Sequence, residues 1–412
     1  MTFPARLTAA VLCGVVAAAS VPATASAHPA RGELVDVVPV STMDTNQVAK
    51  YLGDYSLDAS RVRFGVDAKR IVYRTIDPAG RPTTASALIV LPRNDDRSPH
   101  QVTWLHGTTG YRGSVASVAD GNDRAAALLF ASAGYLTTAP DYLGLGTGPG
   151  FHPYVDAPST VTASVDALRA AGRLATRKGL RPDRRVMITG HSQGGHATMA
   201  MGEALQHDRQ FEVGALAPIG GPFKPSLLVG KALNGEISNG VAYMAYWTVA
   251  WNRLFHLYDN PAEVFRDPSV EALFDGEHRN EDIFSHLPAT MHELVTDAYF
   301  ERLRNPTGTL RARLREADSY CDWRPRVSVK IYSSAGDKDT LLETSRLLRP
   351  TPEAAPRRVH AHRPGPGRRP RQGSQDRPPP HPRRLRPHLK TMNGAFVHVR
   401  WTKAPFIVQT GG

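Results

Sequence analysis

The sequence predicts an α/β fold in which a mostly parallel, twisted sheet is flanked by helices. Short apolar runs typical of strands alternate with helix-like segments through most of the chain. Of the 412 residues, 41% are hydrophobic, which is enough to fill a sizeable core. A pentapeptide of the form Gly-x-Ser-x-Gly, at residues 190–194, joins one of the apolar runs to a helix-like segment. This strand-to-helix order is what the predicted fold requires.

The first 27 residues are typical of a secretory signal peptide. Arg6 precedes an apolar run over residues 7–19, and Ala25, Ser26 and Ala27 form the small-residue pattern at which such peptides are cleaved. The run is too short for a membrane span, and no later stretch approaches the roughly 18 apolar residues that a span needs. We therefore expect cleavage after Ala27 and a secreted, extracellular protein.

The cysteine count bears on how the mature chain is stabilised. Cys13 leaves with the signal peptide, so Cys321 is then the remaining cysteine. No internal disulfide can form, and the fold must depend on its hydrophobic core.

The formal charge of +12 is concentrated at the C-terminal end. From Arg346 onward the chain has 15 Lys or Arg and 2 Asp or Glu, whereas residues 1–345 have 35 basic and 36 acidic residues and a net charge of −1. The main body is nearly neutral, so the overall charge does not indicate that this body binds nucleic acid or a membrane surface.

Seven apolar segments predict the strands. The first two flank Asp77-Pro78-Ala79-Gly80, a turn-forming tetrapeptide. The seven segments are residues 71–76, 85–91, 102–105, 135–138, 186–189, 213–216 and 327–332. A helix is expected over residues 123–133, between the third and fourth segments. Another is expected between the fourth and fifth, where Val161, Val165, Leu168 and Leu174 recur at helical spacing.

Residues 223–320 break this alternation, and we interpret them as a helical cap insertion within a domain spanning residues 28–345. The insertion has little strand pattern and contains an aromatic cluster: Tyr243, Tyr246, Trp247, Trp251, Phe255 and Tyr258. Two interpretations are open. The rings line an acyl pocket, or they pack the cap against the body as ordinary core residues.

Ser192 stands between two glycines at the point where the strand predicted at residues 186–189 ends. A nucleophilic side chain must be exposed in the active site and not covered by its own backbone. A tight turn between a strand and a helix exposes it, and glycines in the turn leave room for the neighbouring chain. The helix expected over residues 195–206 would direct its dipole, with the N–H of Gln193, at the negative charge of a tetrahedral intermediate. Ser192 is the predicted nucleophile; the alternative is a structural serine in a Gly-rich turn.

A second oxyanion donor is expected from the loop that follows an earlier strand. The segment TWLHGTTG places His106, Gly107 and Thr108 directly after the third predicted strand. We assign the N–H of Thr108, with Gly107 or Thr109 as alternatives and a plain turn as the non-catalytic interpretation. Each such donor lowers the barrier by about 3 to 4 kcal/mol. We expect His106 to hold this loop rather than to transfer protons.

The chain resembles the α/β-hydrolases, and among them secreted bacterial lipases and esterases related to the fungal secretory lipases. The resemblance covers about residues 60–340 and rests on four segments: LHGTTGYR, PDYLGLGTGPGFHPY, GHSQGGHA and SSAGDKD. It implies the α/β-hydrolase fold and a triad that follows the order serine, acid, histidine along the chain. It also implies structural roles for Asp141 and His152 in the loop beneath the site.

The glycine-rich part of this loop does not fit a dinucleotide-binding fingerprint. A fingerprint starting at Gly144 would need a final Gly or Ala where Pro149 stands, and one starting at Gly146 would need it where Phe151 stands. We therefore expect no organic cofactor, and nothing in the sequence implies a metal.

The triad acid should follow a late strand, as the segment SSAGDKD does after residues 327–332. Asp337 occupies the position that the resemblance favours, and Asp339 is the alternative. A hydrophilic turn is the non-catalytic interpretation. A carboxylate paired with the histidine would orient the imidazole and stabilise its protonated form.

The triad histidine is expected where the composition changes abruptly. Residues 349–387 are a mixture of Arg, Pro and His that cannot bury an apolar face, and the tail over residues 346–412 is predicted to be disordered. We interpret this tail as a frameshift product, because GC-rich DNA read out of phase is enriched in Arg, Pro, Gly and Ala. A one-base shift from Arg369 is compatible with a histidine near position 370 followed by an amphipathic helix. The alternative is a genuine basic tail.

The frameshift interpretation leaves the catalytic base unassigned. The tail histidines are His360, His362, His381, His388 and His398, of which the last lies in the most orderable segment. Without its base Ser192 stays protonated, and loss of a triad member costs on the order of a millionfold in turnover. The chain as printed would then be inactive.

The sequence thus predicts a secreted serine hydrolase that cleaves carboxylic esters or lipids through an acyl-enzyme on Ser192. The alternative is a non-catalytic scaffold that binds anionic surfaces through its basic tail. The proline content of the tail, and its lack of aromatic residues up to Leu389, argue against specific recognition of nucleic acid.

Overall fold

Seven strands form one mixed sheet in the order β1-β2-β3-β5-β4-β6-β7. The computed structural model describes residues 30–348, so the predicted signal peptide and the tail from residue 349 onward, with its five histidines, lie outside the described residues. The strands are β1 Leu34–Met43, β2 Val66–Ile76, β3 Pro82–Pro92, β4 Gln101–Leu105, β5 Leu136–Pro140, β6 Arg185–His191 and β7 Glu212–Ile219. The first four in spatial order pair antiparallel, and β5, β4, β6 and β7 pair parallel.

The parallel half of the sheet is built from three strand-helix-strand crossovers. Helix α2 (Asn122–Ser132) joins β4 to β5, α3 (Ala157–Arg177) joins β5 to β6, and α4 (Gln193–Gln206) joins β6 to β7. Because parallel strands end at the same edge of a sheet, the loops after β4, β5, β6 and β7 lie together. The predicted α/β fold class is confirmed.

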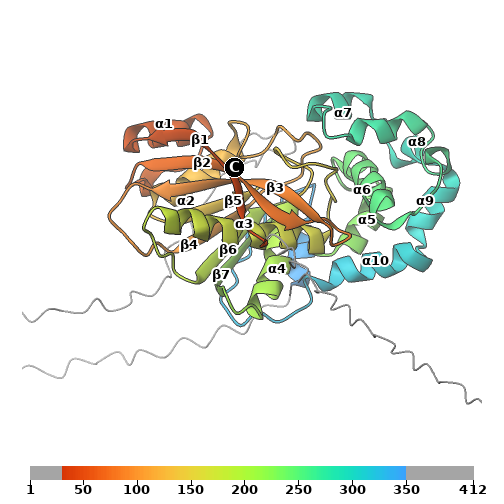
Figure 1. The fold of residues 1–412 in the computed structure, drawn as a ribbon. Helices are drawn as coiled ribbons and strands as arrows, with labels where there is room; N and C mark the ends of the chain where they lie inside the picture. The colour runs from red at the N-terminus through yellow and green to blue at the C-terminus, as the bar shows by residue number, and fades with distance from the viewer. Residues whose placement is uncertain (1–29, 349–412) are drawn as a thin grey trace, which may run out of the picture.

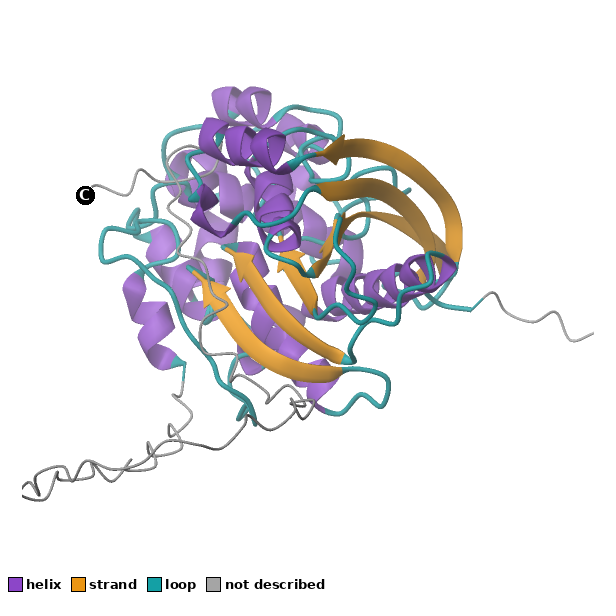
Figure 2. Cartoon of the chain, turned by 90° about the vertical axis from the view of Figure 1, so that its left-hand side faces the viewer, coloured by secondary structure: helices purple, strands orange, loops and turns teal. Residues whose placement is uncertain are grey.

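Helices cover the sheet on both of its faces (Figure 2). Side chains alternate along the strands, so that Leu88 and Val90 of β3 pack with α2 and with α1 (Thr45–Asp54). Ala87 and Ile89 of the same strand pack against α3 on the opposite face. Near β6 and β7 the second face is covered by α4 as well. Cys321 is buried in this second region and is free, with no disulfide partner in the described part of the chain.

Helices α5–α10 lie together at one side of the body (Figure 1). They are α5 Pro225–Leu233, α6 Gly240–Phe255, α7 Asn280–His286, α8 Met291–Leu294, α9 Asp297–Arg304 and α10 Gly308–Ser319, and they form the helical cap insertion. The cap has its own core, which contains most of the predicted aromatic cluster. No helix in residues 30–348 is long and apolar enough to cross a membrane.

Three features differ from the sequence-based expectations. Strand β1 and helix α1 were not predicted, because β1 is an edge strand with mostly exposed or half-buried side chains and therefore has a weak apolar pattern. Residues 327–332 form two isolated parallel bridges with β7, Leu216 with Val329 and Ile219 with Tyr332, rather than a continuous strand. Helix α11 (Leu342–Leu347) crosses the boundary drawn at residue 345.

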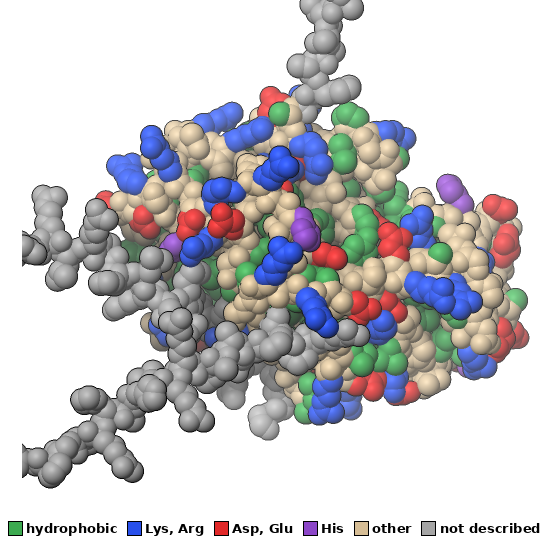
Figure 3. All heavy atoms as spheres, turned by 90° about the horizontal axis from the view of Figure 1, so that it is seen from below, with side chains coloured by type: hydrophobic (Ala, Val, Ile, Leu, Met, Phe, Trp, Pro, Cys, Tyr) green, Lys and Arg blue, Asp and Glu red, His purple; other side chains and the backbone are tan. Residues whose placement is uncertain are grey.

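Figure 3 shows one face of the molecule, on which basic and acidic side chains are interspersed. This mixture agrees with the near-neutral net charge calculated for residues 1–345.

Asp166 of α3 ties the N-terminal segment and the sheet together from a fully buried position. Its carboxylate accepts hydrogen bonds from Arg31 Nε at 2.9 Å, from Thr75 Oγ1 at 2.7 Å and from Arg169 Nη1 at 2.7 Å. A buried carboxylate stabilises the fold only while all of its donors are present. Removal of one partner leaves a desolvated polar group without its hydrogen bond.

Asp166→Ala is expected to lower the free energy of unfolding by about 2 to 3 kcal/mol, since Arg31 is partly exposed and retains some solvation. Asp54→Ala is the matched control, because Asp54 pairs with Lys50 on an exposed helix surface. Asp54→Ala should lower the free energy of unfolding by less than about 1 kcal/mol. Urea unfolding followed by circular dichroism measures both, and equal losses in the two variants would contradict the anchoring role.

Candidate active site

Ser192 lies between β6 and α4 in a backbone conformation that few residues adopt. Its φ is 55° and its ψ is −119°, a combination that costs a residue with a side chain about 1 to 3 kcal/mol. The conformation is held by two hydrogen bonds: Ser192 N–H donates to Ile219 O of β7 at 2.9 Å, and Gly195 N–H donates to Ser192 O at 2.8 Å. The turn therefore keeps the half-buried serine at the carboxyl edge of the sheet.

Gly190 and Gly194 allow this turn to approach β4. A Cβ at Gly194 would lie 1.9 Å from Leu105 O, and one at Gly190 would lie 2.5 Å from the same oxygen. Real Cβ atoms do not approach backbone oxygens this closely, so side chains are excluded at both positions. The two glycines of the predicted pentapeptide are thus required by packing against the end of β4.

The loop after β4 reaches the serine in the same way. A Cβ at Gly107 would lie 3.5 Å from Ser192 Cβ and 3.4 Å from His191 O. Thr108 follows and lines a cavity together with Ser192 and Gln193. Gln193 is the first residue of α4, whose first-turn N–H groups have no partner within the helix. The structure thus brings the two predicted oxyanion donors to the cavity that Ser192 lines.

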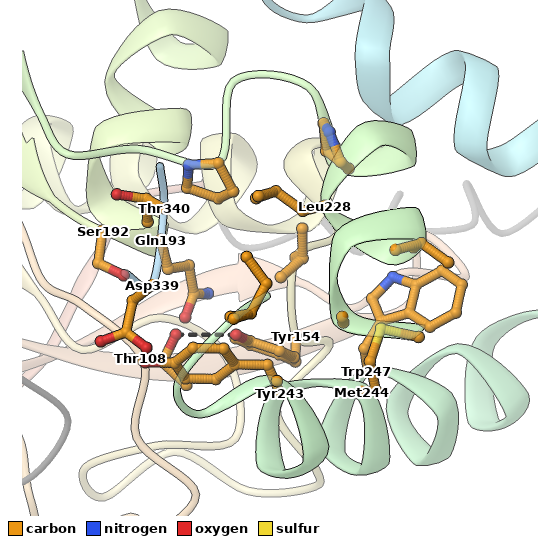
Figure 4. A pocket seen from close by; sticks show the side chains of 17 residues that line it. Thr108, Tyr154, Ser192, Gln193, Leu228, Tyr243, Met244, Trp247, Asp339 and Thr340 are labelled. Atoms are coloured by element: carbon orange, nitrogen blue, oxygen red, sulfur yellow. Dashed lines mark hydrogen bonds between the residues drawn. The ribbon is translucent and has the colours of Figure 1, made fainter. Parts of the chain in front are cut away.

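The cavity has two unlike parts (Figure 4). Ser192, Thr108 and Asp339 lie on one side of it. The rest is lined mainly by apolar side chains of α5, α6 and the segment between them, namely Leu228, Val229, Ala232, Ile237, Met244 and Trp247, with Tyr243 beside them. Of the predicted aromatic cluster, Tyr243 and Trp247 line the cavity, while the other four pack within or against the cap core. Packing as core residues thus describes most of the rings, while the acyl pocket stays a prediction for Tyr243 and Trp247.

Asp337 and Asp339 have different environments. Asp337 Oδ1 accepts the N–H groups of Asp339 and Thr340 at 2.9 Å each, and its Oδ2 accepts the Thr340 hydroxyl at 2.7 Å. It does not appear among the residues that line the cavity, whereas Asp339 does. Asp337 shapes the turn, and Asp339, the alternative in the sequence, faces the serine side of the cavity.

Asp339 is buried and only half satisfied. Its Oδ1 accepts Asn239 N–H at 3.2 Å and Asn239 Nδ2 at 2.9 Å, while its Oδ2 has no hydrogen-bond partner among the described residues. Burial raises the pKa of Asp339 to about 6, although hydrogen bonds from Asn239 and from the side chain of Tyr243 act in the opposite direction. Sequence reasoning missed Asn239, because its role depends on the cap folding back onto the turn at residues 337–340. A buried carboxylate with one vacant oxygen is suited to hold a cationic or hydrogen-donating partner.

His152 orients the side chain of Gln193. Its Nδ1 lies 3.0 Å from Leu143 O and must donate to that carbonyl, so Nε2 accepts from Gln193 Nε2 at 3.0 Å. Burial lowers the pKa of His152 to about 3, which keeps the ring neutral. His152 therefore contacts Gln193 from the core side.

Asp141 and His106 hold the loops below the site. Asp141 accepts hydrogen bonds from the hydroxyls of Ser86 and Ser117, and burial raises its pKa. His106 lies between Gly107 O, at 2.7 Å, and Asp141 O, at 3.2 Å. These contacts are of the structural kind expected for His106, Asp141 and His152.

Within residues 30–348, no histidine lines the cavity. His191 is adjacent to Ser192, and burial lowers the pKa of its imidazole. The same part of the chain contains no group of three or more His, Cys, Asp or Glu side chains arranged to hold a metal ion. Among the described residues, Ser192, Thr108, Gln193 and Asp339 are thus the predicted site residues that line the cavity.

The geometry resembles that of known hydrolases, although no protein-family model matches the chain and no curated protein sequence matches it. The ligand-bound structure of the rice cell wall degrading esterase LipA from Xanthomonas oryzae is similar at 26% identity and a TM-score of 0.69, covering 78% of this chain and 87% of LipA. A hydrolase structure from Legionella pneumophila is similar at 24% identity and a TM-score of 0.70, covering 77% and 87%. Candida antarctica lipase A shares the fold at 12% identity and a TM-score of 0.55, covering 77% and 72%.

These similarities establish the fold. The chain is an α/β-hydrolase in architecture, and its neighbours in structure include esterases and lipases. The resemblance stated from the sequence is confirmed at this level, while the link to the fungal secretory lipases stays a prediction.

Gly194→Ala is expected to lower the free energy of unfolding by about 3 kcal/mol or more, because the new methyl group would overlap the Leu105 carbonyl. Gly230→Ala is the control: Gly230 lies inside α5, and a Cβ there meets nothing within 4 Å. The control should be neutral or stabilise the protein by up to about 1 kcal/mol. Chemical unfolding measures both, and a tolerated Gly194→Ala would refute the close approach.

Replacing Asp339 is expected to change how stability depends on pH. A carboxyl whose pKa is higher in the folded state stabilises the protein below its unfolded pKa of 3.8, and this stabilisation is lost as the pH rises through about 6. Between pH 3.5 and pH 8 the wild type should therefore lose about 3 kcal/mol relative to Asp339→Asn.

Asp337→Asn provides the contrast, because the native Asp337 carboxylate accepts three hydrogen bonds and its loss should destabilise the turn at neutral pH. Parallel unfolding curves at several pH values measure both variants. If the gap between wild type and Asp339→Asn is independent of pH, the assignment of a buried, unsatisfied carboxyl at position 339 is wrong.

Proposed function

We propose that this chain, an α/β-hydrolase in fold, is a secreted serine hydrolase that cleaves carboxylic esters. The observation that carries the proposal is the placement of Ser192 in a strained strand-to-helix turn on an apolar cavity, with Thr108 and Gln193 beside it. The similarity to an esterase and a lipase supports an ester as the substrate. Secretion rests on the signal peptide predicted at residues 1–27.

The proposed reaction begins at the hydroxyl of Ser192. The triad base takes the hydroxyl proton as the oxygen attacks the ester carbonyl carbon, the N–H groups of Thr108 and Gln193 stabilise the resulting oxyanion, and the base then gives this proton to the departing alcohol. Because α4 begins at Gln193, the positive end of its dipole adds to this stabilisation. The alcohol leaves, and water then hydrolyses the acyl-enzyme to release the acid and regenerate the serine.

Asp339 is our choice for the triad acid. It lines the cavity, its Oδ2 is unpaired among the described residues, and Asn239 fixes the carboxylate in place. Asp337, the position favoured by the sequence resemblance, has its carboxylate engaged by its own turn. The unpaired oxygen of Asp339 is suited to accept a hydrogen bond from an imidazole N–H.

The base must come from outside residues 30–348, because no described histidine lines the cavity. We propose that it belongs to the correct reading frame of the C-terminal segment and is absent from the chain as printed. The apolar side of the cavity would receive the acyl group, and its lining by Leu228, Met244 and Trp247 favours an uncharged, apolar acid moiety.

The test compares three full-length proteins: the chain as printed, a version with the reading frame restored beyond residue 348, and the restored version carrying Ser192→Ala. The restored protein should turn over p-nitrophenyl esters and be labelled by a fluorophosphonate at Ser192. The printed chain should be slower by up to about a millionfold, and Ser192→Ala should abolish labelling.

Each outcome of this comparison has a distinct meaning. Turnover that survives Ser192→Ala would exclude this serine as the nucleophile. No turnover in any of the three proteins would favour the non-catalytic scaffold instead. Sequencing the gene and reading its last hundred codons in three frames checks the frameshift directly.

A further inference from the structure

A second concave region lies at the opposite edge of the sheet from Ser192. It is a shallow region, open to solvent, bordered by Gln101 at the start of β4, Arg184 just before β6, Phe211 just before β7 and the C-terminal part of α3. Ser192 follows the other end of β6, and this seven-residue strand is about 23 Å long at 3.3 Å per residue. The region is therefore separate from the candidate active site.

Arginine dominates the charged side chains of this region. Five arginines line it, Arg169, Arg173, Arg177, Arg181 and Arg184, together with a single acidic residue, Asp183. Asp183 is already engaged, because its carboxylate lies 2.8 Å from His100 Nδ1. Carboxylates also lie near two of the arginines, Asp166 and Asp208 beside Arg169 and Glu212 beside Arg184, so the excess positive charge of the region is that of Arg173, Arg177 and Arg181. We call this region the arginine groove.

Two of the five arginines are fixed by the fold. Arg169 donates to the buried carboxylate of Asp166 at 2.7 Å and to Gln210 Oε1 at 3.2 Å. Arg184 donates to the backbone carbonyls of Arg209 and Gln210. These two side chains form the ordered ends of the groove.

The other three arginines carry charge that the described part of the chain does not neutralise. Arg173, Arg177 and Arg181 are exposed, and none of them forms a salt bridge or a side-chain hydrogen bond within residues 30–348. Arg169, Arg173 and Arg177 follow one another at intervals of four residues on α3, so their Cα atoms are about 6 Å apart along the helix axis. Arg173 and Arg177 thus lie one turn apart on the exposed surface of α3, with Arg181 in the loop that follows the helix.

We propose that the arginine groove binds a linear polyanion, a chain that carries repeated carboxylate, sulfate or phosphate groups. Guanidinium groups match these oxyanions through paired N–H donors, and a row of them matches a chain of charges better than a single ion. The proposal does not depend on the esterase activity, because it concerns residues at the other edge of the sheet. Its consequence is that the protein can be held on an anionic polymer while the cavity beside Ser192 stays accessible.

The shape of the groove favours a flexible chain over two other anionic partners. A membrane surface is broad and flat, whereas these arginines line a hollow. Single-stranded nucleic acid is usually bound with aromatic side chains that stack on the bases. Phe211 is the aromatic residue of the groove, and it is buried in the core beneath α3 and α4.

The experiment measures modification of individual arginines in the full-length chain. Phenylglyoxal labelling, read peptide by peptide by mass spectrometry, is compared without ligand and with polygalacturonate, dextran sulfate, polyphosphate, orthophosphate, single-stranded DNA or anionic vesicles. Arg311 and Arg315 are the internal control, because they are exposed and four residues apart on α10. At a ligand concentration about three times the dissociation constant, labelling of Arg173, Arg177 and Arg181 should slow about fourfold, with Arg311 and Arg315 unchanged.

A matched pair of variants tests the same site without interference from the basic segment beyond residue 348. In Arg173→Gln/Arg177→Gln, the polyanion concentration that half-protects Arg181 should rise about tenfold, because two charge contacts are lost. In Arg311→Gln/Arg315→Gln it should not change. Both variants alter exposed helix positions and should keep the melting temperature of the parent.

The results separate the possible ligands. Protection by polygalacturonate, dextran sulfate or polyphosphate supports the proposal, and which of the three protects best identifies the oxyanion. Protection by DNA alone or by vesicles alone would overturn it in favour of those partners. Equal protection of all five measured arginines, or an Arg181 response that is unaffected in Arg173→Gln/Arg177→Gln, would also overturn it. None of these readouts involves ester turnover, so failure here and failure of the proposed activity are distinguishable.

Discussion

The close approach of β4 to the turn around Ser192 is the constraint on which the candidate site depends. The Leu105 carbonyl occupies space that any side chain at position 194 would need. This contact packs the start of α4 against the end of β4, and a side chain at Gly107 would meet Ser192. The position of the serine is therefore set by backbone packing. The strain at Ser192 is supported by its hydrogen bond to Ile219 of β7.

The cap takes part in the site as well as covering it. Ser238 N–H donates to Lys338 O, and Asn239 holds the Asp339 carboxylate, so the segment between α5 and α6 is joined to the turn that carries the acid. The same helices supply most of the apolar lining of the cavity. Burial by the cap also explains why the pKa of Asp339 is raised, since a desolvated carboxylate favours its neutral form. The lining of the cavity and the protonation of Asp339 thus depend on the same segment of chain.

The two edges of the parallel sheet differ in chemistry. The carboxyl edge carries an apolar cavity with a few polar groups directed at one point, which suits an uncharged ester. The amino edge carries the arginine groove, in which positive charge is spread along a helix. The strands between them are short and well packed on both faces, so the two regions keep a fixed separation. If the arginine groove anchors the protein to a polyanion, this separation leaves the cavity directed away from the anchor.

The sequence by itself determined the α/β class, the position of the Gly-Ser-Gly turn and the loop after β4, because these features depend on local periodicity and on glycines next to one another in the chain. It did not determine β1, whose edge position leaves too few buried side chains to produce a pattern. The different environments of Asp337 and Asp339 come from the tertiary structure. The two aspartates are two residues apart and follow the same late segment. Asn239 folds onto the turn and contacts the buried carboxylate of Asp339, whereas the carboxylate of Asp337 accepts backbone N–H groups of its own turn. The arginine groove likewise joins α3 to the loops before β6 and β7, and no local pattern relates residues so far apart in the chain.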